Sequence, residues 1–373
     1  MAVMNYASKY ASKVDERFYK ESQAMLALNS DYKFTGVKTV TVYSIPVVGM
    51  TDYQRSGANR YGTPNDLAMN TQEMTVKKDR AFTFIIDKGD KTQTQMVNDA
   101  GKALSRQTRE VCIPEFDTYV FKTLAAAATK RGGYATTEIT KANAYEKFLT
   151  GMEWLGNHNV PDVGRVAYCT YKFYNLLKQD PAFVKYGNAS QEMLKRGELG
   201  EVDGCKIVRV ASNRLPAGAA FLITHACAAT GPKQLEDYKI HENPPGISGW
   251  LVEGRMIYDC FVLNEKADAI YYHGSQAVLK DLIVGTAATA AGKSTILINS
   301  EKEGAKRYYM TAADANSLTA VTYGTAITTS AWTELTANSQ EITPTGGHTM
   351  VRVVEVDSAG KPIAVGDALL NIG

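Results

Sequence analysis

Two β-rich runs are separated by a polar insertion that neither run can bury. Residues 36–48 and 74–87 carry Val, Ile, Phe, Tyr and Thr in near alternation, and they predict one long antiparallel hairpin. The insertion, residues 49–73, contains glycines and is about twice the length at which loops in compact domains become uncommon. We expect this arm either to move freely or to pack on something outside its own domain.

A second constraint is a very long helical pattern over residues 92–130, which a Gly-Gly pair ends. Pro114 lies inside it. Because proline has no N–H and its ring clashes with the preceding turn, the helix is expected to kink or restart there. Glu115 and Asp117 favour a restart, since acidic side chains in a first turn meet the positive end of the helix dipole.

The N-terminal part and the middle of the chain mix helix with strand. Residues 7–28 have a ragged helical pattern without a strong apolar stripe, and such a helix needs a partner surface. The middle predicts helices at 144–156 and 171–179, and strands near 165–169, 206–211, 219–224, 250–263 and 269–273. This part of the chain is therefore expected to be α+β.

The composition changes after Gly274, where the chain has 14 threonines and no cysteine. Short β-rich runs follow at close to regular spacing, at 282–284, 295–299, 307–311, 318–323, 331–335, 349–356 and 362–370. Turn residues separate them. The pattern predicts a C-terminal all-β immunoglobulin-like sandwich.

Charge and composition exclude several classes of protein. Of the 373 residues, 41 are Lys or Arg and 39 are Asp or Glu, so no basic field could hold DNA unaided, which argues against a dedicated DNA reader. The longest apolar stretches are far too short to cross a bilayer, and we expect no signal or transit peptide and no membrane contact. The five cysteines are widely spaced, which favours a reducing cytosol over a disulfide framework or a zinc ribbon.

One motif approaches a phosphate-binding loop, at Gly292-Lys293-Ser294. The glycine that such a loop needs five residues earlier is Ala287, and the following residues are β-like where a helix should begin. We expect a solvated hairpin turn, and a nucleotide-binding enzyme stays as an alternative of another class. Histidines and cysteines form no metal-ligand or nucleophile pattern. No catalytic, cofactor or metal residue is therefore proposed, and the chain is not expected to be an enzyme.

A basic cluster lies on the second β run, either on a solvated strand face or against acidic groups of a neighbouring subunit. Helices and hairpins that cannot bury both faces within their own subunit are stabilised by neighbouring subunits. This points to a self-assembling protein. The candidate inter-subunit contacts are Lys77, Lys78, Arg80, Phe82, Phe84, Glu115 and Asp117.

In their order, these pieces resemble the major capsid protein of tailed bacteriophages, which has the Hong Kong 97 fold. The resemblance covers residues 1–273. Its motifs are patterns of residue types and contain no catalytic or ligand-binding groups, so the order of the motifs along the chain is the main support for it. It rests on VCIPEFDTYVFKTL at 111–124, GRVAYCTYKFYNLLKQDPAF at 164–183, GELGEVDGCKIVRVASNRLP at 197–216 and EGRMIYDCFVLNEKADAIYYH at 253–273.

The resemblance implies a division of the chain. Residues 1–34 would be an N-terminal arm and 35–90 an extended loop laid over a neighbouring subunit. A peripheral domain with the spine helix would span 91–164, an axial domain 165–255 and the closing strands of the peripheral domain 256–273. The immunoglobulin-like domain, 274–373, lies outside the shared fold and would project from the outer surface.

The implied function is structural: hexamers and pentamers form an icosahedral shell around double-stranded DNA, without sequence specificity. The expected location is the virion, assembled in the cytoplasm of the host bacterium. Expected partners are other copies, a separate scaffold protein, a portal, and a decoration protein or host-surface glycan on the last domain. An encapsulin-type nanocompartment shell is the nearest alternative, and a bacterial adhesin is disfavoured because no secretion signal is seen.

Overall fold

The structure is a computed structural model that describes residues 22–32, 39–63, 66–67, 69–89, 100–181, 200–298 and 305–373. The chain divides into two compact units. Unit 1 comprises residues 1–117 and 226–267, and unit 2 comprises 118–225 and 268–373. Each unit is therefore built from segments that are distant in the sequence. Among the described helices, none is long and apolar enough to cross a membrane.

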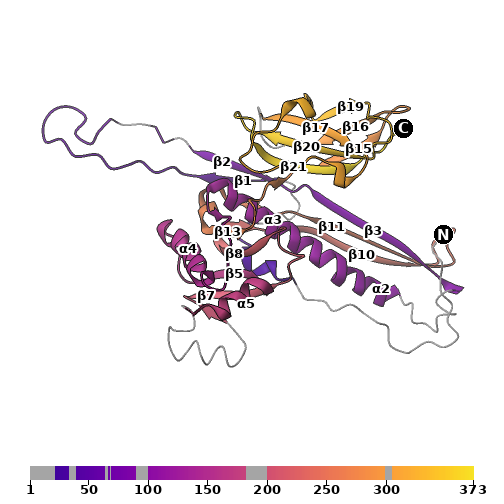
Figure 1. Cartoon of the computed structure of the whole chain (residues 1–373), viewed down its shortest axis with the longest axis horizontal. Coiled ribbons are helices and arrows are strands. Elements are labelled where there is room, and N and C mark those ends of the chain that lie inside the picture. Colours follow the sequence, from indigo (N-terminus) through magenta and orange to yellow (C-terminus); the bar gives the residue numbers. More distant parts are fainter. Residues whose placement is uncertain are drawn as a thin grey trace. The chain divides into compact units, whose positions relative to one another are not determined.

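Most of the helix predicted at 7–28 lies outside the described residues; its end forms a short 3₁₀ turn, η1 (Ala24–Ala27). In unit 1, β1 (Thr39–Ser44) pairs antiparallel with β2 (Asn70–Thr75) (Figure 1). The name arm is used from here on for residues 39–75. The base of the arm packs on a small cluster that includes Met74, Val76 and Leu263. The predicted antiparallel arm is therefore present.

The predicted hairpin is wrong in its extent, because the second β run serves two sheets. Its first part, β2, pairs with β1, and after Val76 its second part, β3 (Lys78–Asp87), pairs with β11 (Gly249–Tyr258). Between β2 and β3, the Lys77 N–H donates to the Asp259 carboxylate at 2.9 Å instead of to a ladder carbonyl. Alternation along 74–87 predicts a strand, but it does not predict this change of partner.

Unit 1 contains a three-stranded antiparallel sheet in the order β10-β11-β3, with β10 at Lys233–Glu242. One face packs against α2 (Ala100–Gln107) through a cluster that includes Ile86, Ala100 and Val252. The expected end of the axial domain at residue 255 falls inside β11, whose ladder with β3 runs unbroken to Tyr258. Residues 226–267 consequently belong with unit 1.

Just before Pro114, where a kink or a restart is predicted, the long helix changes its hydrogen-bond pattern but stays helical. Between α2 and α3 (Ile113–Arg131) lies a π-helical segment, η2 (Thr108–Cys112). The Ile113 N–H bonds the Thr108 carbonyl, five residues back. Since Pro114 has no N–H to give to a carbonyl one turn back, the wider turn lets the hydrogen-bond ladder resume beyond it. Residues 92–99 of the predicted helix lie outside the described residues.

Unit 2 contains a six-stranded sheet in the order β4-β13-β8-β5-β7-β6. Its aromatic core joins Phe148 of α4 and Phe173 of α5 to Phe221 of β8, with ring centroids 5.9 and 4.5 Å from Phe221. The predicted helices, and the strands predicted at 165–169, 206–211, 219–224 and 269–273, are confirmed to within one residue, whereas β4 and β6 were not predicted. The bounds are β4 (Tyr134–Ala135), α4 (Ala144–Asn157), β5 (Arg165–Thr170), α5 (Tyr171–Gln179), β6 (Glu201–Val202), β7 (Cys205–Val210), β8 (Ala219–His225) and β13 (Ile270–Gly274).

The short connecting elements are η3 (Ala226–Ala228), β9 (Ala229–Thr230), β12 (Phe261–Val262) and η4 (Asn264–Ala269). Strands β9 and β12 pair antiparallel.

The last part of unit 2 is a two-sheet β sandwich. Its sheets have the orders β14-β21-β20-β17-β18 and β15-β16-β19, and they share a core that includes Ile296, Ile342, Val351 and Val353. The strands are β14 (Lys280–Asp281), β15 (Val284–Ala288), β16 (Ser294–Ile298), β17 (Lys306–Ala312), β18 (Thr333–Glu334), β19 (Ser339–Ile342), β20 (Met350–Val356) and β21 (Pro362–Leu369). Its immunoglobulin-like character stays a prediction.

The strand predicted at 318–323 is absent from the described structure. The residues between β17 and β18 instead carry two 3₁₀ turns, η5 (Ala315–Ser317) and η6 (Thr329–Ala331). Their apolar side chains, including Val321, Ile327 and Trp332, pack in one cluster with Val354 and Val356 of β20. The apolar run at 318–323 therefore covers a sheet instead of joining one.

Candidate assembly surfaces

Strand β3 positions several predicted contact residues, and it places Phe82 and Phe84 inside their own unit. Their rings stack with centroids 6.2 Å apart, and the ring of Tyr238 lies 6.1 Å from that of Phe82. Gly254 leaves the space for this stack, because a Cβ there would lie 2.4 Å from the Phe82 ring. Both phenylalanines are half-buried and pack in the cluster with α2.

Arg80 and Glu115 contact each other. Arg80 Nε lies 2.7 Å from Glu115 Oε1, and the Tyr258 hydroxyl donates to the same oxygen at 3.1 Å. Burial, and then the charge of Glu115, raise the pKa of Tyr258 well above its ordinary value, so the hydroxyl remains a donor. The pair joins β3 to the start of α3.

The remaining predicted residues also have partners or burial within unit 1. Asp117 is fully buried and accepts hydrogen bonds from Ser22 and Gln23. Lys77 and Lys78 are half-buried at the start of β3, where Lys78 lies opposite Tyr258 in the ladder. The structure thus brings Arg80 and Glu115 together and sends Asp117 to the N-terminal segment. The predicted contacts between subunits stay a proposal.

A charged surface that the sequence did not predict covers the other face of the three-stranded sheet. Arg255 forms a bidentate pair with Asp79 at 2.6 and 2.9 Å, and this holds the pKa of Asp79 below its ordinary value. Beside it, Lys239 lies 2.8 Å from Asp237. These groups line a shallow open groove of about 430 Å³. The surface was missed because the charged strand β10 has no clean apolar alternation.

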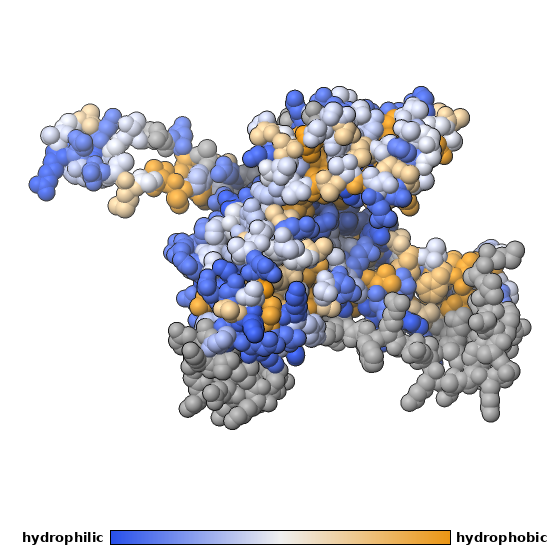
Figure 2. All heavy atoms as spheres, viewed as in Figure 1, coloured by the Kyte–Doolittle hydropathy of each residue, from blue (hydrophilic) through white to orange (hydrophobic). Residues whose placement is uncertain are grey.

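The arm exposes many large apolar side chains. Figure 2 shows the most apolar of them near β1 and β2, while the far end of the arm is mostly hydrophilic. Met50 and Val47 are 102% and 95% exposed. At the far end, Tyr53 and Tyr61 pack edge to face with centroids 5.0 Å apart, so the tip has local order. Exposed apolar groups in such a run mark a contact surface. The others are Tyr43, Ile45, Val48, Leu67 and Met69.

The motif at Gly292-Lys293-Ser294 is the turn of the β15–β16 hairpin, as predicted. Gly292 has φ +74°, a left-handed conformation that glycine adopts freely. Lys293 Nζ lies 2.6 Å from Glu341 Oε1, and no helix follows to offer its N-terminus to a phosphate. The structure gives the nucleotide-binding alternative no support.

Within the described residues, no cluster of three or more His, Cys, Asp or Glu side chains could hold a metal ion. The five cysteines are free thiols. Burial raises the pKa of Cys205 to about 12 and that of Cys169 well above its ordinary value, so both thiols stay protonated at neutral pH.

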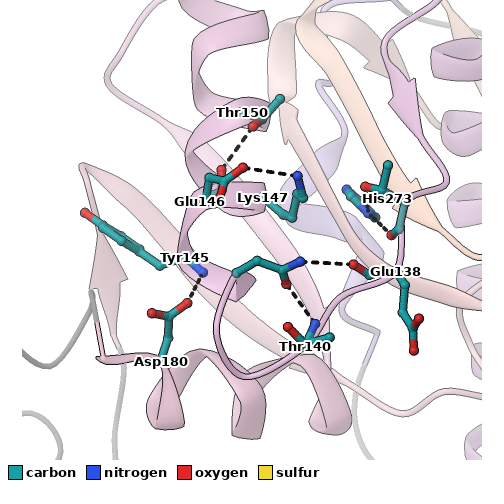
Figure 3. Close-up of polar contacts among 10 residues, drawn as sticks. Glu138, Thr140, Tyr145, Glu146, Lys147, Thr150, Asp180 and His273 are labelled. Atoms are coloured by element: carbon teal, nitrogen blue, oxygen red, sulfur yellow. Dashed lines mark hydrogen bonds and ion pairs between the residues drawn. The ribbon is translucent and has the colours of Figure 1, made fainter.

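His273 is a buried titratable group at the end of β13, beside α4 (Figure 3). Its Nε2 donates to the Thr137 carbonyl at 2.8 Å, while Nδ1 has no partner in the described part of the chain. Burial lowers the pKa of His273, and the positive charge of Lys147 lowers it further. Protonation would place a second buried N–H without an acceptor.

This geometry predicts that unit 2 loses stability in acid. The unfolded imidazole titrates near 6.5 and the folded one at a lower pH, so stability is complete above about pH 6.5 and falls as the pH drops from there through the folded pKa. We expect the fall in Tm between pH 7.5 and 5 to be smaller in His273→Gln than in the unmodified chain. His158→Gln, at an exposed histidine, is the control and should keep the original slope. Equal slopes in all three proteins would contradict the assignment.

No family model matches the sequence, and no curated protein matches it. Solved structures do match. A structure from Mycobacterium phage Che8 is 16% identical, covering 74% of this chain and 99% of that one, with a TM-score of 0.60. The capsid of cyanophage P-SCSP1u is 15% identical, covering 72% and 92%, with a TM-score of 0.58. The mature capsid of bacteriophage PhiM1 is 13% identical, with the same coverage and a TM-score of 0.57.

At these identities the likeness is one of fold. The covered share is nearly the whole of each phage chain and about three quarters of this one. The α+β class and the Hong Kong 97 fold predicted from the sequence are therefore confirmed, and the chain has the fold of tailed-phage capsid structures.

Proposed function

We propose that the chain is a major capsid protein that assembles into the icosahedral shell of a tailed bacteriophage and encloses its double-stranded DNA. The observation that carries the proposal is the exposed apolar arm on a fold shared with phage capsids. An exposed run of this kind is a cost for a lone subunit and a binding surface for an assembly.

The arm is proposed to lie over a neighbouring subunit. Burying a large apolar side chain contributes about 1.5–3 kcal/mol before the entropy of ordering is counted. A shell repeats each contact in every subunit, so modest contacts suffice. The arm takes the role of the extended loop, the three-stranded sheet and α2–α3 that of the peripheral domain, and the six-stranded sheet that of the axial domain.

The β sandwich at residues 274–373 is proposed to be an outer-surface addition. It is about the size of the quarter of the chain that the phage structures leave uncovered, which supports its lying outside the shared fold. A decoration protein or a host-surface glycan is the proposed ligand class. A separate scaffold, a portal and DNA held without sequence specificity complete the proposed partners, and the net charge of +2 suits a shell that lies beside DNA without gripping it.

Electron microscopy of the chain expressed in bacteria, with and without a candidate scaffold from the same genome, tests the proposal. Closed shells or rings of capsomer size are expected. A dispersed monomer in both conditions would contradict it. Shells that contain enzymes instead of nucleic acid would favour the encapsulin-type alternative.

A further inference from the structure

The segment 22–32, here called the strap, is anchored on α3 by Asp117. This carboxylate is fully buried. It accepts from the Ser22 hydroxyl at 2.6 Å and from the backbone N–H groups of Gln23 and Ala24 at 3.1 and 3.4 Å. Asp117 thus caps the turn η1, whose Ala24 and Ala27 have no exposed surface. A buried carboxylate satisfied by three donors of one segment fixes that segment firmly.

A second anchor holds the other end of the strap on residues 226–231. The Asn29 N–H donates to the Ala229 carbonyl at 2.9 Å, and its side-chain amide donates to the Ala226 carbonyl at 3.1 Å. The Thr230 hydroxyl donates back to the Asn29 carbonyl at 3.2 Å. Leu28 fills the space above Gly231, where a Cβ would lie 2.4 Å from its Cδ1.

Both anchors lie where the backbone passes from one unit to the other. The chain crosses between residues 117 and 118 inside α3, and again between residues 225 and 226 just before η3. We propose that the strap is a latch: while it is docked, it restrains these two crossings, and its release lets both of them move. The strap does this with residues of unit 1 alone, so the latch acts within a single subunit and does not depend on the shell proposal.

Hydrogen exchange on the unassembled full-length chain tests the latch. In Gly231→Val, the added methyl groups displace Leu28. We expect amide exchange to rise at least tenfold in the strap and also in peptides covering 113–121 and 224–232. Adding Leu28→Ala to Gly231→Val removes the clash and should restore protection. Gly156→Ala is the matched control, because a Cβ at Gly156 meets nothing within 4 Å.

Asp117→Asn tests the other anchor without adding bulk, and it serves in place of Gly231→Val if that variant does not fold. It weakens the acceptor for Ser22 and Gln23, and faster exchange is expected in the strap and at both crossings, including the distant one at 224–232. The proposal is overturned if the strap exchanges faster while the crossings keep their protection, since the strap would then be passive packing. Unchanged exchange in the strap would also overturn it, because the anchors would not be holding it.

Discussion

Replacing Val47 and Met50 together by aspartate is expected to abolish shell formation while leaving the unfolding transition of the subunit unchanged. Both side chains are fully exposed, so they contribute nothing to the fold that the change could remove. Two carboxylates in a buried contact would each lose hydration without gaining a partner, which is far more costly than losing the apolar contact alone. Sedimentation and electron microscopy would measure assembly, and circular dichroism would measure unfolding.

The matched control is Val163→Asp, which also changes an exposed valine but lies in a loop of unit 2, 87% exposed. It should assemble normally. If the arm variant formed shells in normal yield, the arm would not be an assembly surface. If it failed to fold, the exposure of the arm in the subunit would be in error.

Phe221→Ala is expected to cost about 4 kcal/mol of unfolding free energy, a large share of the about 5–15 kcal/mol that stabilises a domain of ordinary stability. The ring lies between Phe148 and Phe173 on one side of the sheet, and the His273 ring stacks on it with centroids 5.2 Å apart. Removing it leaves a cavity that three rigid rings cannot fill by relaxing. Urea denaturation followed by fluorescence would measure the loss.

Phe221→Leu keeps most of the apolar volume and is the graded control, with an expected loss below about 1.5 kcal/mol. Similar losses of unfolding free energy for the alanine and the leucine variants would show that the packing around this ring is not what stabilises the sheet. A loss below about 1 kcal/mol for alanine would show that the stack does not contribute as described.

The sequence predicted the parts of the fold that local periodicity specifies. Helix α5 has the predicted bounds, and β5, β7 and β8 begin or end within one residue of theirs, because their buried apolar residues form runs that the local pattern specifies. Pro114 predicted a disturbance of the long helix for a purely backbone reason, and the π-helical segment η2 lies just before it. Strand β10 was missed because its sequence, which includes Asp237 and Lys239, has no clean apolar alternation.

The candidate site was predicted as a region, and its predicted contact residues stay a prediction. The length of the insertion at 49–73 predicted the arm. Only the structure distinguishes the fully exposed side chains, such as Val47, from those that pack within their own unit. From the sequence, Phe82 and Asp117 were both predicted to contact a neighbouring subunit. In the structure the first packs on Tyr238 and the second accepts hydrogen bonds from Ser22, each a partner far away along the chain.

By itself, the sequence determined the α+β class, the hairpin turn at Lys293 and the presence of an arm too long to bury, while the domain boundary near Gly274 stays a prediction. Each follows from composition, spacing or backbone chemistry within about ten residues. The tertiary structure alone decided that β3 pairs with β11 instead of β1, that the chain crosses between two units, and that Asp117 holds the strap. These depend on contacts between segments separated by many tens of residues, and periodicity carries no information about which distant segment supplies the partner.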